Sequence, residues 1–184
     1  VPNTYEFYWN TSAEQFRDRM KKEYDTFWNE RRQKAADDLG LSREEVISLA
    51  AIVQKETAKV DERAKVAGVY LNRLKINMKL QADPTVIYAK KHEENDFDQM
   101  IKRVLFSHLE IDSPYNTYLN HGIPEGVIAM PDISSIDGVL FAEEHDYLYF
   151  VADTTNFGYH MFAKSYAQHN RNKRQYIEWV SKQK

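Results

Sequence analysis

The segment Leu49-Ala50-Ala51-Ile52-Val53-Gln54-Lys55-Glu56-Thr57 is the stretch around which the rest of the chain is organised. The pattern predicts that this stretch is the second half of an amphipathic helix. Val46, Leu49, Val53 and Glu56 follow one another at spacings of three, four and three residues, so they lie on the same face of that helix. Glu56 therefore stands where the apolar face should continue, and burial there would raise the pKa of its carboxyl group. A group of that kind suits general acid catalysis, whereas the ordinary alternative is a solvated glutamate near a helix end.

The composition describes one globular domain spanning residues 1–184. The chain has 184 residues, 42% of them hydrophobic, and a formal net charge of −3. This charge argues against a nucleic-acid partner bound by bulk electrostatics. The absence of cysteine excludes disulfides, thiolate metal sites and cysteine nucleophiles. No apolar run approaches the ~20 residues that a membrane-spanning helix needs.

The first half of the chain is predicted to be helical after an extended lead-in over residues 1–10. Thr11, as part of a capping box with Glu14, predicts a helix that continues to Leu39 and is ended by Gly40. Ser42 and Glu45 form a second capping box, at the start of the helix that carries Glu56. A third helix is predicted from Asp61, with an apolar face of Val66, Val69, Tyr70 and Leu74. Gly68 inside it predicts close packing against a neighbour.

The second half of the chain mixes short elements. Alternation of Ile76, Met78 and Leu80 predicts a half-buried strand over 75–81, and Asp83-Pro84 predicts a helix start with Asp83 as N-cap. We expect a surface loop over 90–98, either a helix or a strand over 100–109, and loops over 113–131. Then follow a helix capped by Asp132, a β-hairpin of residues 147–151 and 159–162, and a helix over 164–184. The fold class is α+β, a helix-rich single domain with a small antiparallel hairpin.

Few familiar chemistries fit the sequence. It contains no P-loop, no dinucleotide-binding glycine motif and no H-E-x-x-H, and its six histidines lack metal-ligand spacing, so we expect neither a cofactor nor a metal. Polar residues within apolar or tightly turned segments remain as candidates: Glu56, the corner Gln81-Ala82-Asp83-Pro84-Thr85, and the segment from Ser113 to Tyr118. Structural alternatives stay open, namely helix capping for Asp83, turn formation for Asn116, and core packing with the hydroxyl at the rim for Tyr115 and Tyr118.

Six segments occur in an order that resembles a known family. They are "AAIVQKET" (50–57), "DERAKVAGVYLNRL" (61–74), "MKLQADPTVIYA" (78–89), "SPYNTYLNHGIPEGVIAMPDISSI" (113–136), "DYLYFVAD" (146–153) and "FAKSYAQHN" (162–170). Together with "NTYEF" near the start, they are similar to the YceG-like family of endolytic murein transglycosylases. The resemblance extends from about Asn3 to Asn170. It implies that the chain is a catalytic domain that cuts peptidoglycan glycan strands.

The resemblance also implies roles for the candidate residues. Glu56 corresponds to the family's catalytic acid/base, a single carboxyl group that cleaves the bond between N-acetylmuramic acid and N-acetylglucosamine without adding water. The substrate-binding candidates are Gln81, Asp83, Thr85, Asn116, Thr117 and Tyr118. The chain departs from the family pattern at Gln54 and Lys55, at Ala82, where some members have Thr, and at Asn77, which replaces a more usual Gly.

Two other functions remain open, and the resemblance adds expectations about location. The chain could be a muramidase that hydrolyses the same bond with Asp83 or Asp112 as second carboxylate. It could also be a non-catalytic peptidoglycan-binding scaffold. The resemblance implies an N-terminal transmembrane helix and a LysM-like region ahead of Val1. It also implies a catalytic domain on the periplasmic, extracytoplasmic side of the inner membrane, and peptidoglycan synthases as partners.

Overall fold

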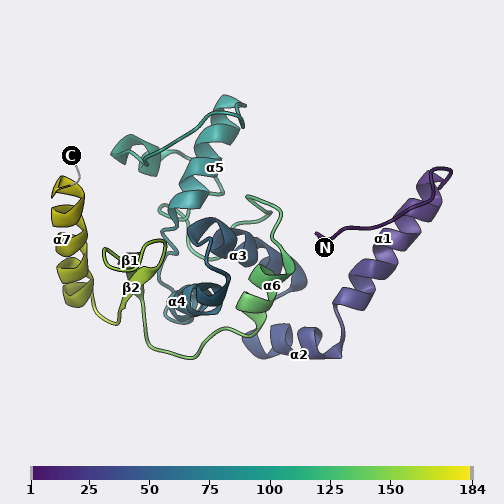
Figure 1. Ribbon diagram of the computed structural model, residues 1–184, viewed down its shortest axis with the longest axis horizontal. Helices are drawn as coiled ribbons and strands as arrows, with labels where there is room; N and C mark the ends of the chain where they lie inside the picture. The colour runs from purple at the N-terminus through teal and green to yellow at the C-terminus, as the bar shows by residue number, and fades with distance from the viewer. Residues whose placement is uncertain (1, 183–184) are drawn as a thin grey trace.

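The computed structural model describes residues 2–182, which form an α+β fold, as the sequence predicts (Figure 1). The α-helices are α1 (Ala13–Phe27), α2 (Glu30–Leu39), α3 (Arg43–Glu56), α4 (Arg63–Lys75), α5 (Asp83–Glu94), α6 (Ile133–Leu140) and α7 (Tyr166–Lys182). Two short 3₁₀ helices are η1 (Val60–Glu62) and η2 (Phe106–Glu110), and the strands are β1 (Tyr149–Ala152) and β2 (His160–Ala163). The strands form the predicted antiparallel hairpin, with Phe150 opposite Phe162.

Helix α3 is the centre of the core. It packs against α2, α4, α5 and α6, and every side chain from Leu49 to Val53 is fully buried. Burying a leucine, isoleucine or valine stabilises the fold by about 1.5–3 kcal/mol. The predicted capping box of Ser42 and Glu45 starts α3. The helix ends at Glu56, because the backbone of Thr57 is extended. The Glu56 side chain therefore lies at a fixed position at the end of the buried helix.

Gly68 explains how closely α4 approaches the segment that precedes β1. A Cβ atom at Gly68 would lie 2.6 Å from the Glu143 carbonyl oxygen and 2.7 Å from Nε2 of His145. No real Cβ atom is found that close to a backbone oxygen. The close packing predicted from the sequence is therefore confirmed.

Replacing Gly68 with Ala is expected to destabilise the chain by about 1–3 kcal/mol, because one of the two backbones has to move. Gly138→Ala in α6 is the matched control, since its Cβ would meet the Cβ of Arg63 at 3.2 Å, a milder contact. Both variants gain helix propensity of about 1 kcal/mol, so the difference in their stability reports how much closer the contact at Gly68 is than the contact at Gly138. Urea unfolding measures it, and equal midpoints for the two variants would contradict the packing argument.

The predicted single helix over 11–39 is wrong. The chain forms two helices there, because the Asn29 side chain accepts a hydrogen bond from the Arg32 backbone N–H at 3.0 Å and starts α2 anew. Trp28, at the break, is 4% exposed and packs into the core. The cap of α1 is Ser12 with Gln15, rather than Thr11 with Glu14. Gly40 ends α2 in the left-handed conformation, as expected.

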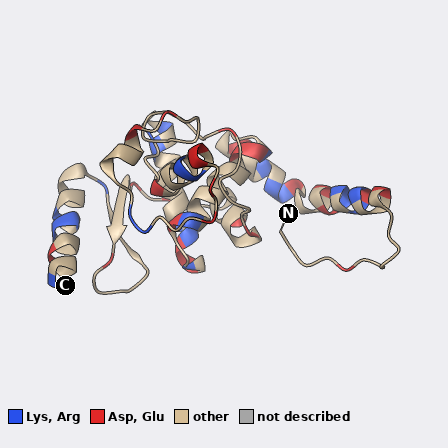
Figure 2. Ribbon diagram, turned by 90° about the horizontal axis from the view of Figure 1, so that it is seen from above, with Lys and Arg blue, Asp and Glu red and all other residues tan. Residues whose placement is uncertain are grey.

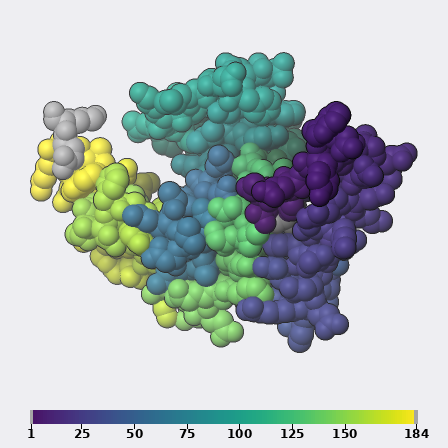
Figure 3. All heavy atoms as spheres, turned by 45° about the vertical axis from the view of Figure 1, so that its right-hand side comes forward, coloured from purple at the N-terminus to yellow at the C-terminus, as the bar shows by residue number. Residues whose placement is uncertain are grey.

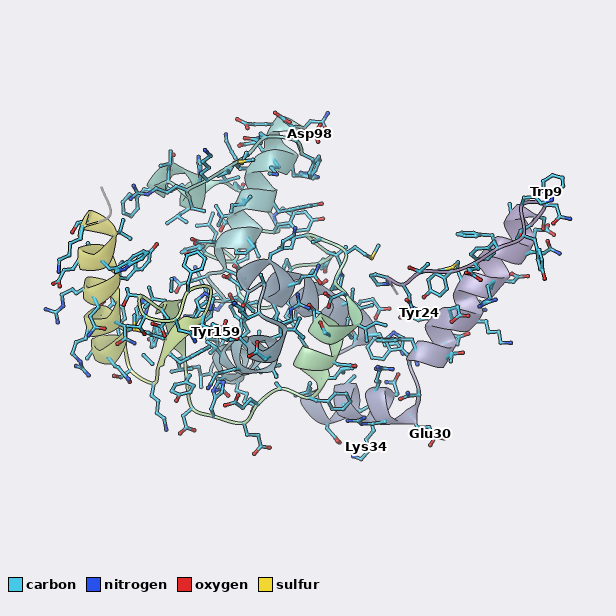
Figure 4. The ribbon with its side chains drawn as sticks, in the orientation of Figure 1. Trp9, Tyr24, Glu30, Lys34, Asp98 and Tyr159 are labelled. Carbon is cyan, nitrogen blue, oxygen red and sulfur yellow. The ribbon has the colours of Figure 1, made fainter. Side chains whose placement is uncertain are left out.

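Helix α1 projects away from the core and carries both charge signs along its length (Figure 2). Trp9 lies at its outer end (Figure 4), where it is 98% exposed. This part of the chain lies on the side of the molecule opposite α7 (Figure 1). It therefore contributes nothing to the cavity described below.

The predicted strand over 75–81 is also wrong. Asn77 and Gln81 adopt positive φ values of 53° and 47°, which break an extended run into turns. Helix α5 then starts with Ala82 as N-cap, so Asp83 is the first helical residue instead of the cap. It continues through the predicted loop to Glu94, where the i,i+4 pair of Lys90 and Glu94 lies at 2.8 Å.

The start of α4 and the segment before η2 also differ from the sequence prediction. Asp61 lies in η1, and α4 has Glu62 as N-cap without a side-chain cap. Residues 100–105 are irregular. Asp132 caps α6 through a hydrogen bond from the Ser135 N–H at 2.9 Å, as predicted. Across residues 2–182, no helix has both the length and the apolar character needed to cross a membrane.

Candidate active site

Glu56 lies in the wall of a cavity of about 270 Å³ between the helical core, the hairpin and α7. Helices α3 and α4 form one side, the first turn of α5 and the loop before residue 120 form another, and β1 and α7 close the third. The lining residues are Glu56, Tyr70, Arg73, Gln81, Asp83, Tyr118, Tyr149, Phe150, Tyr166 and His169. Six of these ten side chains carry a hydroxyl, an imidazole or an aromatic ring, so the cavity combines two carboxyl groups with a largely aromatic wall.

Glu56 is partly exposed as a residue, but its carboxyl group is buried and accepts a hydrogen bond from the Tyr70 hydroxyl, with Oη 2.7 Å from Oε1. Burial raises its pKa from 4.5 to about 7, and the negative charge of Asp83 acts in the same direction. The Tyr70 hydrogen bond and the more distant His160 and Arg73 oppose the rise. Near pH 7 the group is therefore present in both the protonated and the ionised form.

Tyr70 and Arg73 come from one face of α4, three residues apart. Tyr70 is 1% exposed, and its ring meets the Phe150 ring edge-on at a centroid distance of 6.0 Å. Arg73 is 7% exposed and donates from Nε to the Leu148 carbonyl at 2.7 Å and from Nη1 to the Leu80 carbonyl at 2.5 Å. It therefore ties α4 to the start of β1 and to the turn that carries Gln81.

Asp83 and Tyr118 form the opposite wall. The Tyr118 hydroxyl donates to Oδ1 of Asp83 at 2.6 Å. Burial raises the pKa of Tyr118, and the Asp83 hydrogen bond and charge raise it further, so the phenol stays neutral. Asp83 makes no cap hydrogen bond to α5. Its carboxylate is thus held toward the cavity by Tyr118 rather than by the helix start.

The other predicted site residues lie behind this wall. Thr85, Asn116 and Thr117 are at most 1% exposed. Thr117 Oγ1 accepts the Ala82 N–H at 3.0 Å and lies 2.9 Å from Oγ1 of Thr85. The Asn116 amide donates to the Leu109 and Ile111 carbonyls at 3.0 and 2.8 Å. Their polar atoms thus hold the loop against α5, and they are positioned to support the cavity rather than to line it.

The structure therefore brings four sequence candidates together at one cavity: Glu56, Gln81, Asp83 and Tyr118. Asp112, an alternative second carboxylate, is exposed and does not line it. The sequence predicts Tyr70 in the core, Tyr149 in the hairpin and His169 on the apolar face of the last helix, and it assigns no role to Arg73. The sequence feature that could have identified both residues is the three-residue spacing of Tyr70 and Arg73, which places two polar groups on the apolar face of α4.

Among residues 2–182, no three histidine or acidic side chains converge as metal ligands do.

Replacing Tyr70 with Phe is expected to move the alkaline limb of any Glu56-dependent activity to higher pH. The hydroxyl stabilises the ionised carboxylate, so its removal raises the pKa of Glu56 and keeps the acid protonated longer. A hydrogen bond to a charged group contributes about 1.5 kcal/mol or more, which corresponds to about one pH unit. The pH profile of kcat/KM measures the change, and a limb that stays in place or moves to lower pH would contradict the assignment.

Comparison with known proteins finds similarity over most of the chain. The model of the YceG-like family matches residues 1–175. The chain is 41% identical over 138 residues to the endolytic murein transglycosylase of Bacillus subtilis (strain 168), covering 74% of this chain and 36% of that protein. It is 33% identical over 137 residues to the endolytic murein transglycosylase of Streptococcus pneumoniae (strain D39), covering 74% of this chain and 24% of that protein.

A solved structure has the same fold. The crystal structure of a protein from Listeria monocytogenes described as YceG-like superposes with a TM-score of 0.74 at 35% identity, covering 93% of this chain and 53% of that one. The chain thus spans about a quarter to a third of the two bacterial relatives and about half of the crystallised protein.

Proposed function

Because the chain belongs to the YceG-like family, we propose that residues 1–184 act as the catalytic domain of an endolytic murein transglycosylase. The substrate is the peptidoglycan glycan strand, and the bond cut is the β-1,4 linkage from N-acetylmuramic acid to N-acetylglucosamine. Support comes from the names of the relatives and from one observation above all. A carboxyl group with a pKa of about 7 lies in a cavity wall, hydrogen-bonded to a neutral tyrosine.

In the first step, protonated Glu56 acts as general acid. Its proton passes to the glycosidic oxygen as the bond from that oxygen to the anomeric carbon of the muramic acid breaks. Tyr70 occupies Oε1, which leaves Oε2 to carry the proton toward the sugar. Positioned proton transfer of this kind contributes about 10²–10⁴-fold to the rate. The muramyl N-acetyl group, as an internal nucleophile, assists at the anomeric carbon.

In the second step, the Glu56 carboxylate acts as base. It removes the proton from the sugar's own 6-hydroxyl, and that oxygen bonds to the anomeric carbon to close a 1,6-anhydro ring. The bond from the anomeric carbon to the N-acetyl oxygen breaks at the same time, which restores the N-acetyl group. The carboxyl group regains the proton it gave, and no water enters. A pKa of about 7 suits both steps, because neither form is strongly disfavoured near neutral pH.

The runner-up activity is hydrolysis of the same bond with Asp83 as second carboxylate. One observation favours considering it: Asp83 lines the same cavity as Glu56. Hydrolases of this type place two carboxyl groups around the scissile bond, one of which activates water or forms a covalent intermediate. Asp83 instead accepts the Tyr118 hydroxyl, which reduces the availability of one of its oxygens.

Mass spectrometry of the digested glycan separates the two activities. The transglycosylase leaves 1,6-anhydro ends, and the hydrolase leaves reducing ends that are heavier by one water. We expect anhydro ends from the wild-type chain, and anhydro ends again, at lower yield, from Asp83→Asn. Intact strands after incubation would contradict both activities and leave a peptidoglycan-binding scaffold.

The location follows from the proposed substrate. Murein lies outside the cytoplasmic membrane, so we propose that the chain acts on that side, with its anchor in a part of the protein beyond these 184 residues. Peptidoglycan synthases are the proposed partners, because they make the new glycan strands on which the chain is proposed to act. Membrane fractionation and co-purification of the full-length protein test these two points.

A further inference from the structure

A second cavity of about 200 Å³ adjoins the Glu56 cavity. It is formed by the segment that contains η2, with Arg103, Leu105, Phe106 and Leu109, and by Asp83 and Tyr118. The last two residues also line the Glu56 cavity. The hydrogen-bonded pair of Asp83 and Tyr118 is therefore a wall that both cavities share.

The shape of the molecule agrees with this reading. The segment that contains η2 extends from α5 toward the side on which α7 stands (Figure 1). In the space-filling view the teal residues of this region form a projection above the blue core, separate from the yellow C-terminal residues (Figure 3).

The combined size of the two cavities accommodates one ligand that occupies both. Sites for drug-sized ligands usually measure about 300–1,000 Å³. The cavities measure about 270 and 200 Å³, so each falls below that range and both together fall within it. An oligomer of sugars, with one part in each cavity, fits this division.

The second cavity has the chemistry of a sugar site with an acidic substituent. Phe106 is 90% exposed and Leu105 is 52% exposed, so an apolar ring face is available to cover the C–H face of a pyranose. Arg103 is exposed and forms no ion pair with any residue between 2 and 182. A guanidinium group without a partner suits a carboxylate, and the peptide carried by muramic acid supplies carboxylates.

We propose that the cavity of residues 103–109 binds the peptide-bearing sugars that follow the scissile bond on one side, while the Glu56 cavity binds those on the other. Phe106 stacks on a sugar ring, and Arg103 pairs with a carboxylate of the attached peptide. This inference rests on the proposed function. It also explains why cleavage would occur within a strand. A glycan strand that is bound on both sides of the Asp83–Tyr118 wall places a bond from its interior, rather than its end, next to Glu56.

The test is binding of defined glycan oligosaccharides, with and without their peptides, to the 184-residue chain carrying Glu56→Gln. On that background we expect Phe106→Ala to weaken binding of both oligosaccharides about tenfold, near the upper end for an aromatic contact. Arg103→Ala is expected to weaken only the peptide-bearing one, by about tenfold at low salt. Met100→Ala and Lys102→Ala are the matched controls, since both side chains are exposed nearby but line neither cavity.

The outcomes separate this inference from the proposed activity. Equal affinities for Phe106→Ala and Met100→Ala, or no measurable binding to the parent chain, overturn the second cavity as a glycan site. Equal losses on both oligosaccharides for Arg103→Ala overturn its pairing with the peptide. Cleavage by the chain with Glu56 intact is measured in parallel, so absent cleavage with intact, Phe106-dependent binding overturns the activity alone.

Discussion

Glu56→Gln is expected to reduce cleavage of glycan strands by at least about 10²–10⁴-fold, the contribution of a positioned acid or base. Glutamine keeps the size of the side chain and can still accept the Tyr70 hydroxyl, but it can neither donate the acid proton nor take up the proton of the 6-hydroxyl. Both steps therefore fail together. Release of anhydro-muramic ends, followed by mass spectrometry, measures the loss.

The same substitution is expected to increase stability above neutral pH. The folded chain holds the pKa of Glu56 at about 7 against an ordinary value of 4.5. A pKa raised by folding contributes stability that is fully present below 4.5 and is lost as the pH rises through 7. Glutamine has no such loss, so it gains up to about 3 kcal/mol relative to glutamate at pH 8.

These two measurements together exclude a purely structural role. A residue that mattered only for folding would lose activity and stability in parallel. Activity that falls while the urea midpoint at pH 8 stays or rises assigns Glu56 to chemistry. Unchanged cleavage by Glu56→Gln would falsify the proposed mechanism, and reduced stability at pH 8 would contradict the raised pKa.

Local sequence signals predicted those parts of the fold in which one residue fixes the geometry. The Ser42 and Glu45 capping box, the buried face of α3 and the close approach at Gly68 all follow from such signals. The break after Trp28 and the turns at Asn77 and Gln81 do not. There, tertiary packing of Trp28 and a side-chain cap at Asn29 outweigh a continuous helical pattern, and positive φ values override an alternating one.

The sequence predicts which types of residue belong to the site, but not which of their side chains line the cavity. Composition and spacing identify Glu56, Asp83 and Tyr118 as polar residues in unusual places. They cannot tell that Thr85 and Thr117 bond to each other behind the wall, because that contact joins residues 32 positions apart. Nor can they place Arg73, since its partners are backbone carbonyls, which every residue has.

Arg73→Met is expected to lower both stability and activity, because Arg73 joins three parts of the cavity. Methionine retains an unbranched stem but no donor, so the Leu80 and Leu148 carbonyls lose their hydrogen bonds. An unsatisfied buried acceptor costs about 1–3 kcal/mol, so the two carbonyls together cost about 2–6 kcal/mol. The turn that carries Gln81 and the strand that carries Tyr149 then shift, and we expect kcat/KM to fall about 10- to 100-fold.

The pH profile distinguishes this positioning role from general destabilisation. The charge of Arg73 lowers the pKa of Glu56, so Arg73→Met moves the alkaline limb of kcat/KM to higher pH. Arg73→Lys keeps the charge but not the planar fork, so it leaves the limb in place while losing part of the stability. Gly68→Ala, which is also expected to lose stability and which changes no charge, is the control. If the limb of Arg73→Met coincides with that of Gly68→Ala, Arg73 supports the fold alone and has no electrostatic effect on the acid.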